Sequence, residues 1–423
     1  MRTSGKPVLP SLNENSAGQP ATNDYEPSAQ AASEPGAMAA VAVTLAAIGC
    51  FFNLYATQPL LPLFETLFHA SKADVGRTVS AATLGVALSA PFCGALAERI
   101  GRRKVIVSSI FLMALPTILA ATASGLSQLV FWRFLQGVIM PGVFGVTIAY
   151  ISEEWPPTRV PLVMSIYVSG TVLGGFLGRI LTGVAATHHL IPFFAPSWRN
   201  GFVVIGTFDL IFGVILWRYL PHDSPAPEDA SANGGIWNHL RNPQLLATYA
   251  VGFNVLFTLV GTFSYVTFYL AAPPFGLSPD ALSMIFVVYL VGLIVTPLGG
   301  ICIARIGSRA ALIGAVTAGA CGILLTLVHS LPIILLGLVL CSSGVFVCQS
   351  ASTSYIQSQA PSGGRASAAG LYVMFYYIGG TFAGVVPGWL WRYGAWKACV
   401  ALIVTVQLIT ALIAGGIWKG KEA

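Results

Sequence analysis

The feature that most constrains this chain is a series of twelve long apolar segments separated by short polar connections. A helix that crosses the hydrocarbon core of a bilayer needs about 20 predominantly apolar residues, and segments of this kind recur from residue 38 to residue 418. Their approximate bounds are 38–64, 78–97, 105–122, 127–152, 161–186, 198–219, 244–271, 281–304, 309–328, 332–356, 367–390 and 396–418. The sequence therefore predicts an all-α membrane protein with twelve transmembrane helices.

The composition excludes several classes of protein. Charged residues make up 9% of the chain, whereas soluble domains carry about 25%, so a soluble enzyme is excluded. The net charge is +6, but the basic residues cluster at the ends of apolar segments, and nucleic-acid binding is not expected. The seven cysteines lie in or beside apolar segments without metal-ligand spacing. We therefore expect no metal site and no cofactor.

The chain divides into a tail, two halves and a linker. Residues 1–36 are polar, which predicts a disordered cytoplasmic tail. The longest polar interruption predicts a cytoplasmic linker at 221–243, between an N-terminal six-helix bundle at 37–220 and a C-terminal six-helix bundle at 244–423. The halves contain matching stretches, for example 94–101 and 300–307. A parallel repeat of this kind predicts two pseudo-symmetric bundles with a site between them.

Lysine and arginine set the orientation in the membrane. Fourteen of the 21 lysines and arginines fall in connections on the side of the N-terminus. The opposite side holds Lys72, Arg77, Arg199, Arg392 and Lys397. Because cytoplasmic loops carry an excess of basic residues, we expect both termini to be cytoplasmic and the protein to lie in a bacterial inner (plasma) membrane.

The loop at 94–104 carries a motif that resembles a family signature. The stretch Gly94-Ala-Leu-Ala-Glu98-Arg99-Ile-Gly101-Arg102-Arg103-Lys resembles the signature between the second and third helices of the major facilitator superfamily, with Glu98 in place of the usual aspartate. The resemblance implies the major facilitator fold. It also implies that these residues latch the loop to the helix at 367–390 when the cytoplasmic side is closed. The alternative is a basic cluster that serves topology alone.

Three further stretches support the resemblance. Arg133-Phe-Leu-Gln136-Gly resembles a family motif of the fourth helix, and its arginine is expected to face the bundle interior with a partner. The alternative is a structural ion pair or an arginine bonded to backbone carbonyls. A ladder of Gly170, Gly174 and Gly178 is similar to the antiporter motif, although Gly175 and Arg179 depart from it, and should let the helix at 281–304 approach closely. The second half repeats the ladder as Gly380, Gly384 and Gly388. Together these motifs resemble the drug:proton antiporter branch, including arabinose-efflux-like members.

Proton coupling requires a buried group that can change its charge. Asp209 is the one acidic residue near the middle of an apolar segment, and burial favours the protonated form of a carboxylic acid. Arg133 and Arg179 lie inside the membrane and are its candidate partners. Family resemblance places the helix of Asp209 outside the central cavity, so a structural carboxylate is the alternative. Glu153 and Glu154 are expected to pair with the arginines of the 94–104 loop.

Family resemblance also identifies the helices that surround a substrate cavity. Polar and aromatic residues on these helices are the candidates, although each aromatic could instead face lipid or pack in the core. They are Asn53, Tyr55, Gln58, Arg133, Gln136, Met140, Asn254, Gln349, Tyr372 and Tyr376. A cavity with aromatic rings, amides and one arginine suits neutral or anionic amphiphilic molecules better than cations.

The sequence therefore predicts a secondary transporter that exports a small organic compound or drug by alternating access in exchange for protons. The alternatives are an uncoupled facilitator or an importer of a metabolite such as a sugar or organic anion and, more remotely, a non-transporting membrane sensor. Motifs of hydrolases and nucleotide-binding enzymes are not found, so an enzyme is not expected. The expected partners are a small-molecule substrate, protons and the lipid bilayer, and the expected oligomeric state is a monomer.

Overall fold

The computed structural model describes residues 35–192, 194–223, 236–360 and 365–419. Within these residues the secondary structure is helical, without strands. The helices are α1 (Ala37–Leu54), η1 (Gln58–Leu60), α2 (Leu61–Leu67), α3 (Lys72–Ile100), α4 (Arg102–Ala120), α5 (Leu126–Glu154), α6 (Val160–Thr187), α7 (Trp198–Tyr219), α8 (Ile236–Arg241), α9 (Pro243–Ala271), α10 (Pro279–Ile285), η2 (Phe286–Val291), α11 (Gly292–Ile306), α12 (Ser308–Leu325), α13 (Leu331–Gln359) and α14 (Arg365–Ile417).

The predicted number of membrane crossings is confirmed for the described part of the chain. Eleven helical stretches are long and apolar enough to cross a membrane. The last of them is two helices in succession, because Gly394 and Ala395 in α14 have non-helical backbone angles. The backbone at Ala395 lies in the left-handed region, with φ 49°. We therefore count twelve crossings, and the two parts of α14 are 365–393 and 396–417.

Two of the twelve crossings are interrupted, which we did not predict. The first is α1, a turn at 55–57, η1 and α2, and the eighth is α10, the 3₁₀ helix η2 and α11. Pro59 explains the first interruption, because proline has no backbone N–H and its ring clashes with the carbonyl of the residue four before it, here Tyr55, where α1 ends. The eighth crossing has no proline or glycine inside η2.

The predicted tail and linker lie mostly outside the described residues. Of the tail at 1–36, the structure describes the last two residues, and of the linker at 221–243 it describes 221–223 and 236–243. The linker contains a short helix, α8, which the polar composition of this stretch did not predict. The bounds of the two six-helix bundles stay a prediction.

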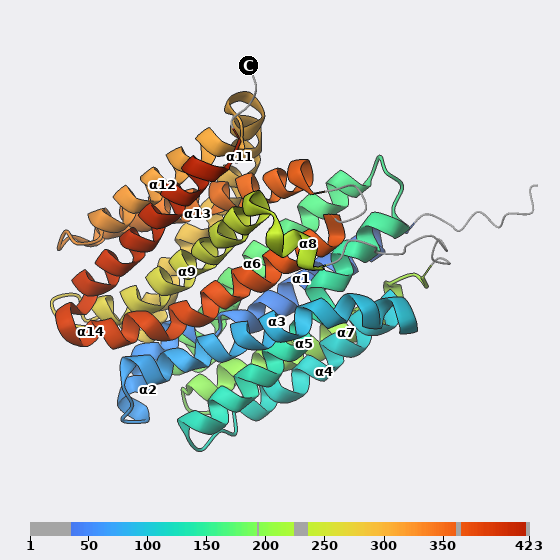
Figure 1. Ribbon diagram of the computed structural model, residues 1–423. Coiled ribbons are helices and arrows are strands. Elements are labelled where there is room, and N and C mark those ends of the chain that lie inside the picture. The colour runs from blue at the N-terminus through green and yellow to red at the C-terminus, as the bar shows by residue number, and fades with distance from the viewer. Residues whose placement is uncertain (1–34, 193, 224–235, 361–364, 420–423) are drawn as a thin grey trace, which may run out of the picture. The chain divides into compact units, whose positions relative to one another are not determined.

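The helices before and after the linker contact each other mainly at one end. Figure 1 shows α3 beside the first part of α14. A Cβ atom added to Gly76 of α3 would lie 1.8 Å from the carbonyl oxygen of Gly384 in α14. Ser80 Oγ donates a hydrogen bond to Thr381 O at 2.5 Å in the same interface. Backbones this close require small residues on both helices.

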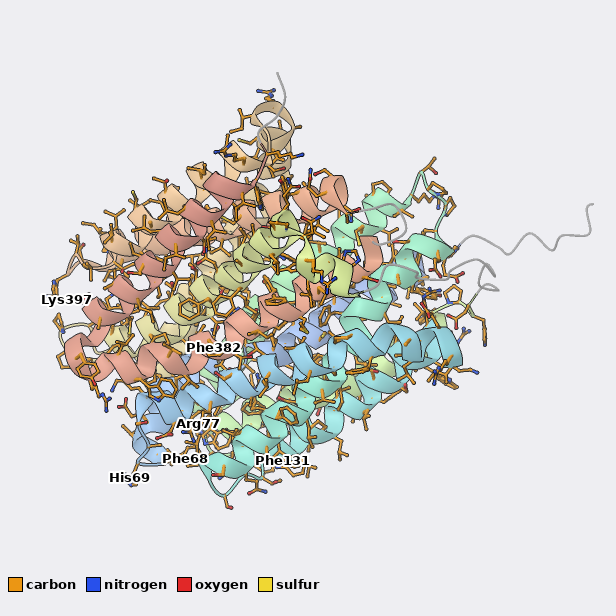
Figure 2. All side chains as sticks on the ribbon, in the orientation of Figure 1. Phe68, His69, Arg77, Phe131, Phe382 and Lys397 are labelled. Carbon is orange, nitrogen blue, oxygen red and sulfur yellow. The ribbon has the colours of Figure 1, made fainter. Side chains whose placement is uncertain are left out.

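We name the two ends of the helices by the charged residues that lie there. At the Lys72 end, the ammonium group of Lys72 pairs with Glu65 of α2 and lies 5.2 Å from the ring of Phe268 and 5.3 Å from that of Trp391. Arg77 lies one turn and a half further along α3, and Figure 2 shows it at this end. At the Arg102 end, α4 begins and α3, α5 and α7 finish.

Candidate functional site

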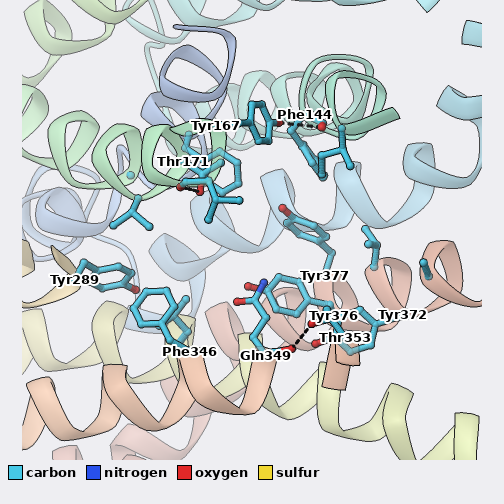
Figure 3. Close-up of a pocket in the computed structure, with 18 of the residues that line it drawn as sticks. Phe144, Tyr167, Thr171, Tyr289, Phe346, Gln349, Thr353, Tyr372, Tyr376 and Tyr377 are labelled. Atoms are coloured by element: carbon cyan, nitrogen blue, oxygen red, sulfur yellow. Dashed lines mark hydrogen bonds between the residues drawn. The ribbon is translucent and has the colours of Figure 1, made fainter. Parts of the chain in front are cut away.

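A cavity of about 350 Å³ lies between the helices before the linker and those after it. Helices α1, α5 and α6 form one wall, and α9, η2, α13 and the first part of α14 form the other (Figure 3). The lining residues are Phe51, Tyr55, Phe144, Ile148, Tyr167, Val168, Thr171, Val172, Gly175, Arg179, Leu259, Tyr289, Phe346, Gln349, Thr353, Ile356, Gln357, Ala369, Tyr372, Val373, Tyr376 and Tyr377. Among these described lining residues, Arg179 alone carries a charge.

The cavity opens toward the Arg102 end. Lining residues on that side, such as Ile148 and Thr353, are exposed, whereas Tyr55 and Arg179 on the other side are buried. Beyond Arg179 the helices close, because Gly183 of α6 packs directly on Ser283 of α10. The structure is therefore accessible from one end and closed at the other.

Four of the predicted cavity residues line this space, and six do not. Tyr55, Gln349, Tyr372 and Tyr376 line it. The prediction is wrong for the others, whose side chains are used within the helix packing, namely Asn53, Gln58, Arg133, Gln136, Met140 and Asn254. Buried polar groups must find hydrogen-bond partners. Asn53, Arg133 and Gln136 find them among one another and in backbone carbonyls. Gln58 bonds Ser264 and Arg179, and Asn254 bonds Thr258. Polarity therefore did not distinguish a cavity wall from a buried network.

Arg133 caps the C-terminal end of α1, the first part of the interrupted first crossing. Its Nη1 donates to Asn53 O at 2.6 Å and its Nη2 donates to Leu54 O at 2.5 Å. Its Nε donates to Thr78 O at 3.0 Å, and Nη1 also bonds Gln136 Oε1. The last carbonyls of a helix lack intrahelical partners and carry partial negative charge, so a cation is favourable there. Arg133 is bonded to backbone carbonyls, which is one form of the structural alternative considered for it.

Asp209 is fully buried, and its partner is an amide. Asn53 Nδ2 donates to Asp209 Oδ2 at 2.9 Å. Asn53 Oδ1 accepts hydrogen bonds from Thr117 Oγ1 at 2.6 Å and from Gln136 Nε2 at 3.3 Å. The expected pairing of Asp209 with Arg133 or Arg179 is not found among the described residues. The connection to Arg133 is indirect and passes through Asn53 and Gln136.

Arg179 lies in an aromatic cage at the closed end of the cavity. Its guanidinium carbon is 4.4 Å from the ring centre of Tyr55, 4.5 Å from that of Phe286 and 4.3 Å from that of Tyr289. Its Nε donates to Gln58 Oε1 and its Nη1 donates to Gly175 O, both at 2.7 Å. Each ring contributes about 0.5–2 kcal/mol. The cage therefore stabilises a buried cation without neutralising it.

The motif at 94–104 holds the ends of α4, α5 and α7. Gly101 has φ 98°, a conformation that suits glycine, and lets α4 begin directly after α3. Arg103 Nε donates to Leu220 O at 2.7 Å, and its backbone N–H donates to Asp223 Oδ1 at 2.8 Å. Arg102 pairs with Glu153 of α5, which confirms the predicted pairing of Glu153 with this loop.

The remaining motif residues face open space in this structure. Glu98 and Arg99 are exposed, and a Cβ atom added to Gly94 would meet nothing within 4 Å. The latch predicted for a closed cytoplasmic side is not formed among the described residues, in a structure whose cavity is open at this end. Its role in the closed state stays a prediction.

The two glycine ladders make different contacts. Cβ atoms added to Gly170, Gly174 and Gly178 would meet Thr44, Ile48 and Phe52 of α1, at 3.0, 2.5 and 2.3 Å. The prediction that this ladder packs against the helix at 281–304 is therefore wrong. In α14, Gly384 and Gly388 lie against Ser80 and Ala73 of α3, so they pack across the interface between the two sides. Gly380 lies between Leu256 of α9 and Thr83 of α3.

Sequence reasoning missed most of the aromatic lining. Tyr167, Tyr289, Phe346 and Tyr377 line the cavity and were not predicted to do so. The helices of Phe346 and Tyr377 were expected to surround the cavity, whereas those of Tyr167 and Tyr289 were not. An aromatic residue in an apolar segment fits lipid contact, core packing and a cavity equally well, so composition alone could not select them.

Comparison with known proteins supports the resemblance that the motifs suggested. The family model described as Major Facilitator Superfamily matches residues 43–384. An uncharacterized transporter of Buchnera aphidicola is 32% identical over 87% of this chain and 88% of its own length. The inner membrane transport protein YnfM of Escherichia coli is 30% identical over 89% of each chain.

A solved structure shares the fold. It is a bacterial homologue of the human lysosomal transporter Spinster, in an inward-facing and unoccupied conformation. The TM-score is 0.75 at 17% identity, and the match covers 90% of this chain and 96% of that one. The antiporter branch within the family stays a prediction. The chain belongs to the Major Facilitator Superfamily and is a multi-pass membrane transporter, not an enzyme.

Proposed function

We propose that this protein is a secondary active transporter that exports a small organic compound by alternating access in exchange for protons. The observation that carries the proposal is the cavity, which is lined from both sides of the linker, open toward the Arg102 end and closed at the Lys72 end. An opening at one end only is what a transporter needs in each of its two states.

In this proposal the Arg102 end faces the cytoplasm, and the membrane is a bacterial inner membrane. The support is the excess of lysine and arginine in the connections at this end. The name of YnfM, an inner membrane transport protein, points to the same compartment. The structure then corresponds to the state that loads from the cytoplasm. The residues Glu98 and Arg102 hold the Arg102 end closed in the opposite state.

The coupling site in this proposal is Asp209. Its carboxylate contacts Asn53, which lies two residues before Tyr55, and Tyr55 both lines the cavity and stacks on Arg179. A carboxylate that gains or loses a proton changes its hydrogen bond with Asn53, and the change reaches the interruption of the first crossing. Proton binding and the cavity wall are thereby linked without direct contact between Asp209 and the solute.

Transport measurements with Asp209→Asn test this coupling. The variant keeps the size of the side chain and cannot ionise. We expect it to lose uphill transport driven by a pH gradient in proteoliposomes, while exchange of labelled for unlabelled solute continues. Asp280→Asn, which removes a carboxylate at the start of α10 away from the network, is the control and should keep both activities.

The alternative is an uncoupled facilitator or an importer, in which Asp209 is a structural carboxylate. The bond to Asn53 favours this reading as well, because it joins α7 to α1 inside one bundle. Full uphill transport by Asp209→Asn would select it and would remove Asp209 from the coupling mechanism.

A further inference from the structure

We propose that Arg179 is the anion-binding group of the cavity, and that the transported compound carries a carboxylate beside an aromatic or aliphatic body. The inference rests on the proposed transport through this cavity and names the chemical class of its solute. It is carried by the charge, the free hydrogen-bonding capacity and the position of this one side chain.

The charge of Arg179 is not balanced by the protein. Within the described residues, no aspartate or glutamate forms an ion pair with it. The lining residues that surround it carry aromatic rings, amides, hydroxyls and aliphatic groups. A buried charge is costly unless an opposite charge or hydrogen bonds compensate for it. An anion in the cavity would supply that compensation, and a cation would be repelled.

The guanidinium group is held in place with one nitrogen unused. Bonds to Gln58 Oε1 and Gly175 O engage Nε and Nη1. Nη2 is buried and makes no hydrogen bond of ordinary geometry to a described residue, although the Tyr289 hydroxyl lies beside the guanidinium group. Arginine presents donors in a planar fork that matches a carboxylate. The free nitrogen can therefore donate to a carboxylate oxygen without breaking the bonds that orient the group.

The cage explains how an unpaired cation is kept at this position. Phe286 and Tyr289 lie on the 3₁₀ helix η2, where side chains three residues apart eclipse each other. Both rings therefore face Arg179 from the same side, while Tyr55, directly after α1, covers it from another. The cage also joins the two walls of the cavity, since Tyr55 and Arg179 precede the linker and η2 follows it.

The rest of the cavity suits an apolar body. From Arg179 toward the Arg102 end the walls carry the rings of Tyr167, Phe346 and Tyr376, with the amide of Gln349 among them (Figure 3). A carboxylate held at the closed end would thus leave an aromatic or aliphatic body between these rings. The arrangement predicts selection for acids over their neutral amides.

Ligand-induced stabilisation of the purified full-length protein tests this selection. The probes are benzoate, cinnamate, 3-phenylpropionate and hexanoate, each compared with its primary amide at equal concentration. Apparent affinities follow from the shift of the unfolding temperature. We expect at least one acid to bind wild type about tenfold or more tightly than its amide, as a charge-assisted hydrogen bond implies.

Two variants locate the effect. In Arg179→Gln the acid and the amide should bind alike, while amide binding persists. Arg179→Lys keeps the charge and should keep part of the preference. If no acid is preferred by wild type, or if Arg179→Gln keeps the preference, the anion site is refuted. The comparison within wild type decides the question even where a variant does not fold.

The outcomes separate this inference from the proposed function. Equal binding of acids and amides would leave a solute-binding cavity, and the transport proposal would stand without its anion site. Failure of both acids and amides to bind would overturn the anion site and also remove the support for transport of such solutes through this cavity.

Discussion

The contact between Gly76 and Gly384 should belong to one transport state alone. A Cβ atom at Gly76 would lie 1.8 Å from Gly384 O, whereas real contacts of this kind need more than 3 Å. In Gly76→Ala the backbones of α3 and α14 must therefore separate by more than an ångström at the Lys72 end. When this end opens, the two helices part, and the added methyl group has no such clash.

The energy of this clash sets the expected shift between states. Inserting a methyl group into a well-packed interface costs about 1–3 kcal/mol. The state seen here should lose this amount of free energy relative to the state open at the Lys72 end. The equilibrium constant between the two states then changes by about 5–150-fold. Gly145→Ala in α5 is the matched control, because its Cβ would meet nothing within 4 Å.

Cysteine labelling measures this equilibrium. In a background without the seven native cysteines, Thr83→Cys reports on the Lys72 end, because Thr83 is fully buried and lies 3.2 Å from Thr381 across the interface. Its maleimide labelling should rise at least fivefold in Gly76→Ala and stay unchanged in Gly145→Ala. Less than a twofold rise, in protein shown to be folded, would refute the assignment of this contact to one state.

Three further predictions concern residues at the two ends and in the buried network. Arg133→Leu should lower the stability by about 2–6 kcal/mol, seen as a lower unfolding temperature in detergent, because four buried hydrogen bonds are lost. An unchanged unfolding temperature would contradict a stabilising role of these hydrogen bonds. Gly101→Val should slow transport while membrane insertion persists, because valine disfavours φ 98° by about 1–3 kcal/mol and would press on Asp223. Lys72→Met should raise labelling of Thr83→Cys about 2–30-fold by removing a cation over two rings, and equal labelling would exclude Lys72 from closing this end.

The twelve crossings could be predicted because lipid imposes a single length requirement on each of them. Pro59 could also have predicted the interruption of the first crossing, since a proline removes the helical hydrogen bond to the residue four before it, which is a local effect. The 3₁₀ stretch η2 has no such local cause. Its conformation accompanies the packing of Phe286 and Tyr289 on Arg179 of a distant helix, which no local pattern reveals.

The site was predicted in part, and the errors have one physical origin. Tyr55, Gln349, Tyr372 and Tyr376 line the cavity as predicted. Asn53 is as polar as any of them, but it faces the network with Asp209. Periodicity shows which residues share a helix face, and the partner that the face meets depends on how the helices assemble. The glycine ladder of α6 shows the same limit, because its spacing predicted a close approach without identifying α1 as the partner.

Solute-driven proton movement tests the central claim most directly. Inverted membrane vesicles with an imposed pH gradient and a pH-sensitive dye would be given the acids and amides named above, together with sugars, drugs and amino-acid derivatives. Wild type would be compared with Ala369→Trp, which fills part of the cavity lining. The account predicts that at least one solute triggers proton movement in wild type and that the Trp variant loses it. Equal proton movement in both, or none across the panel in vesicles that contain folded protein, would contradict proton-coupled transport through this cavity.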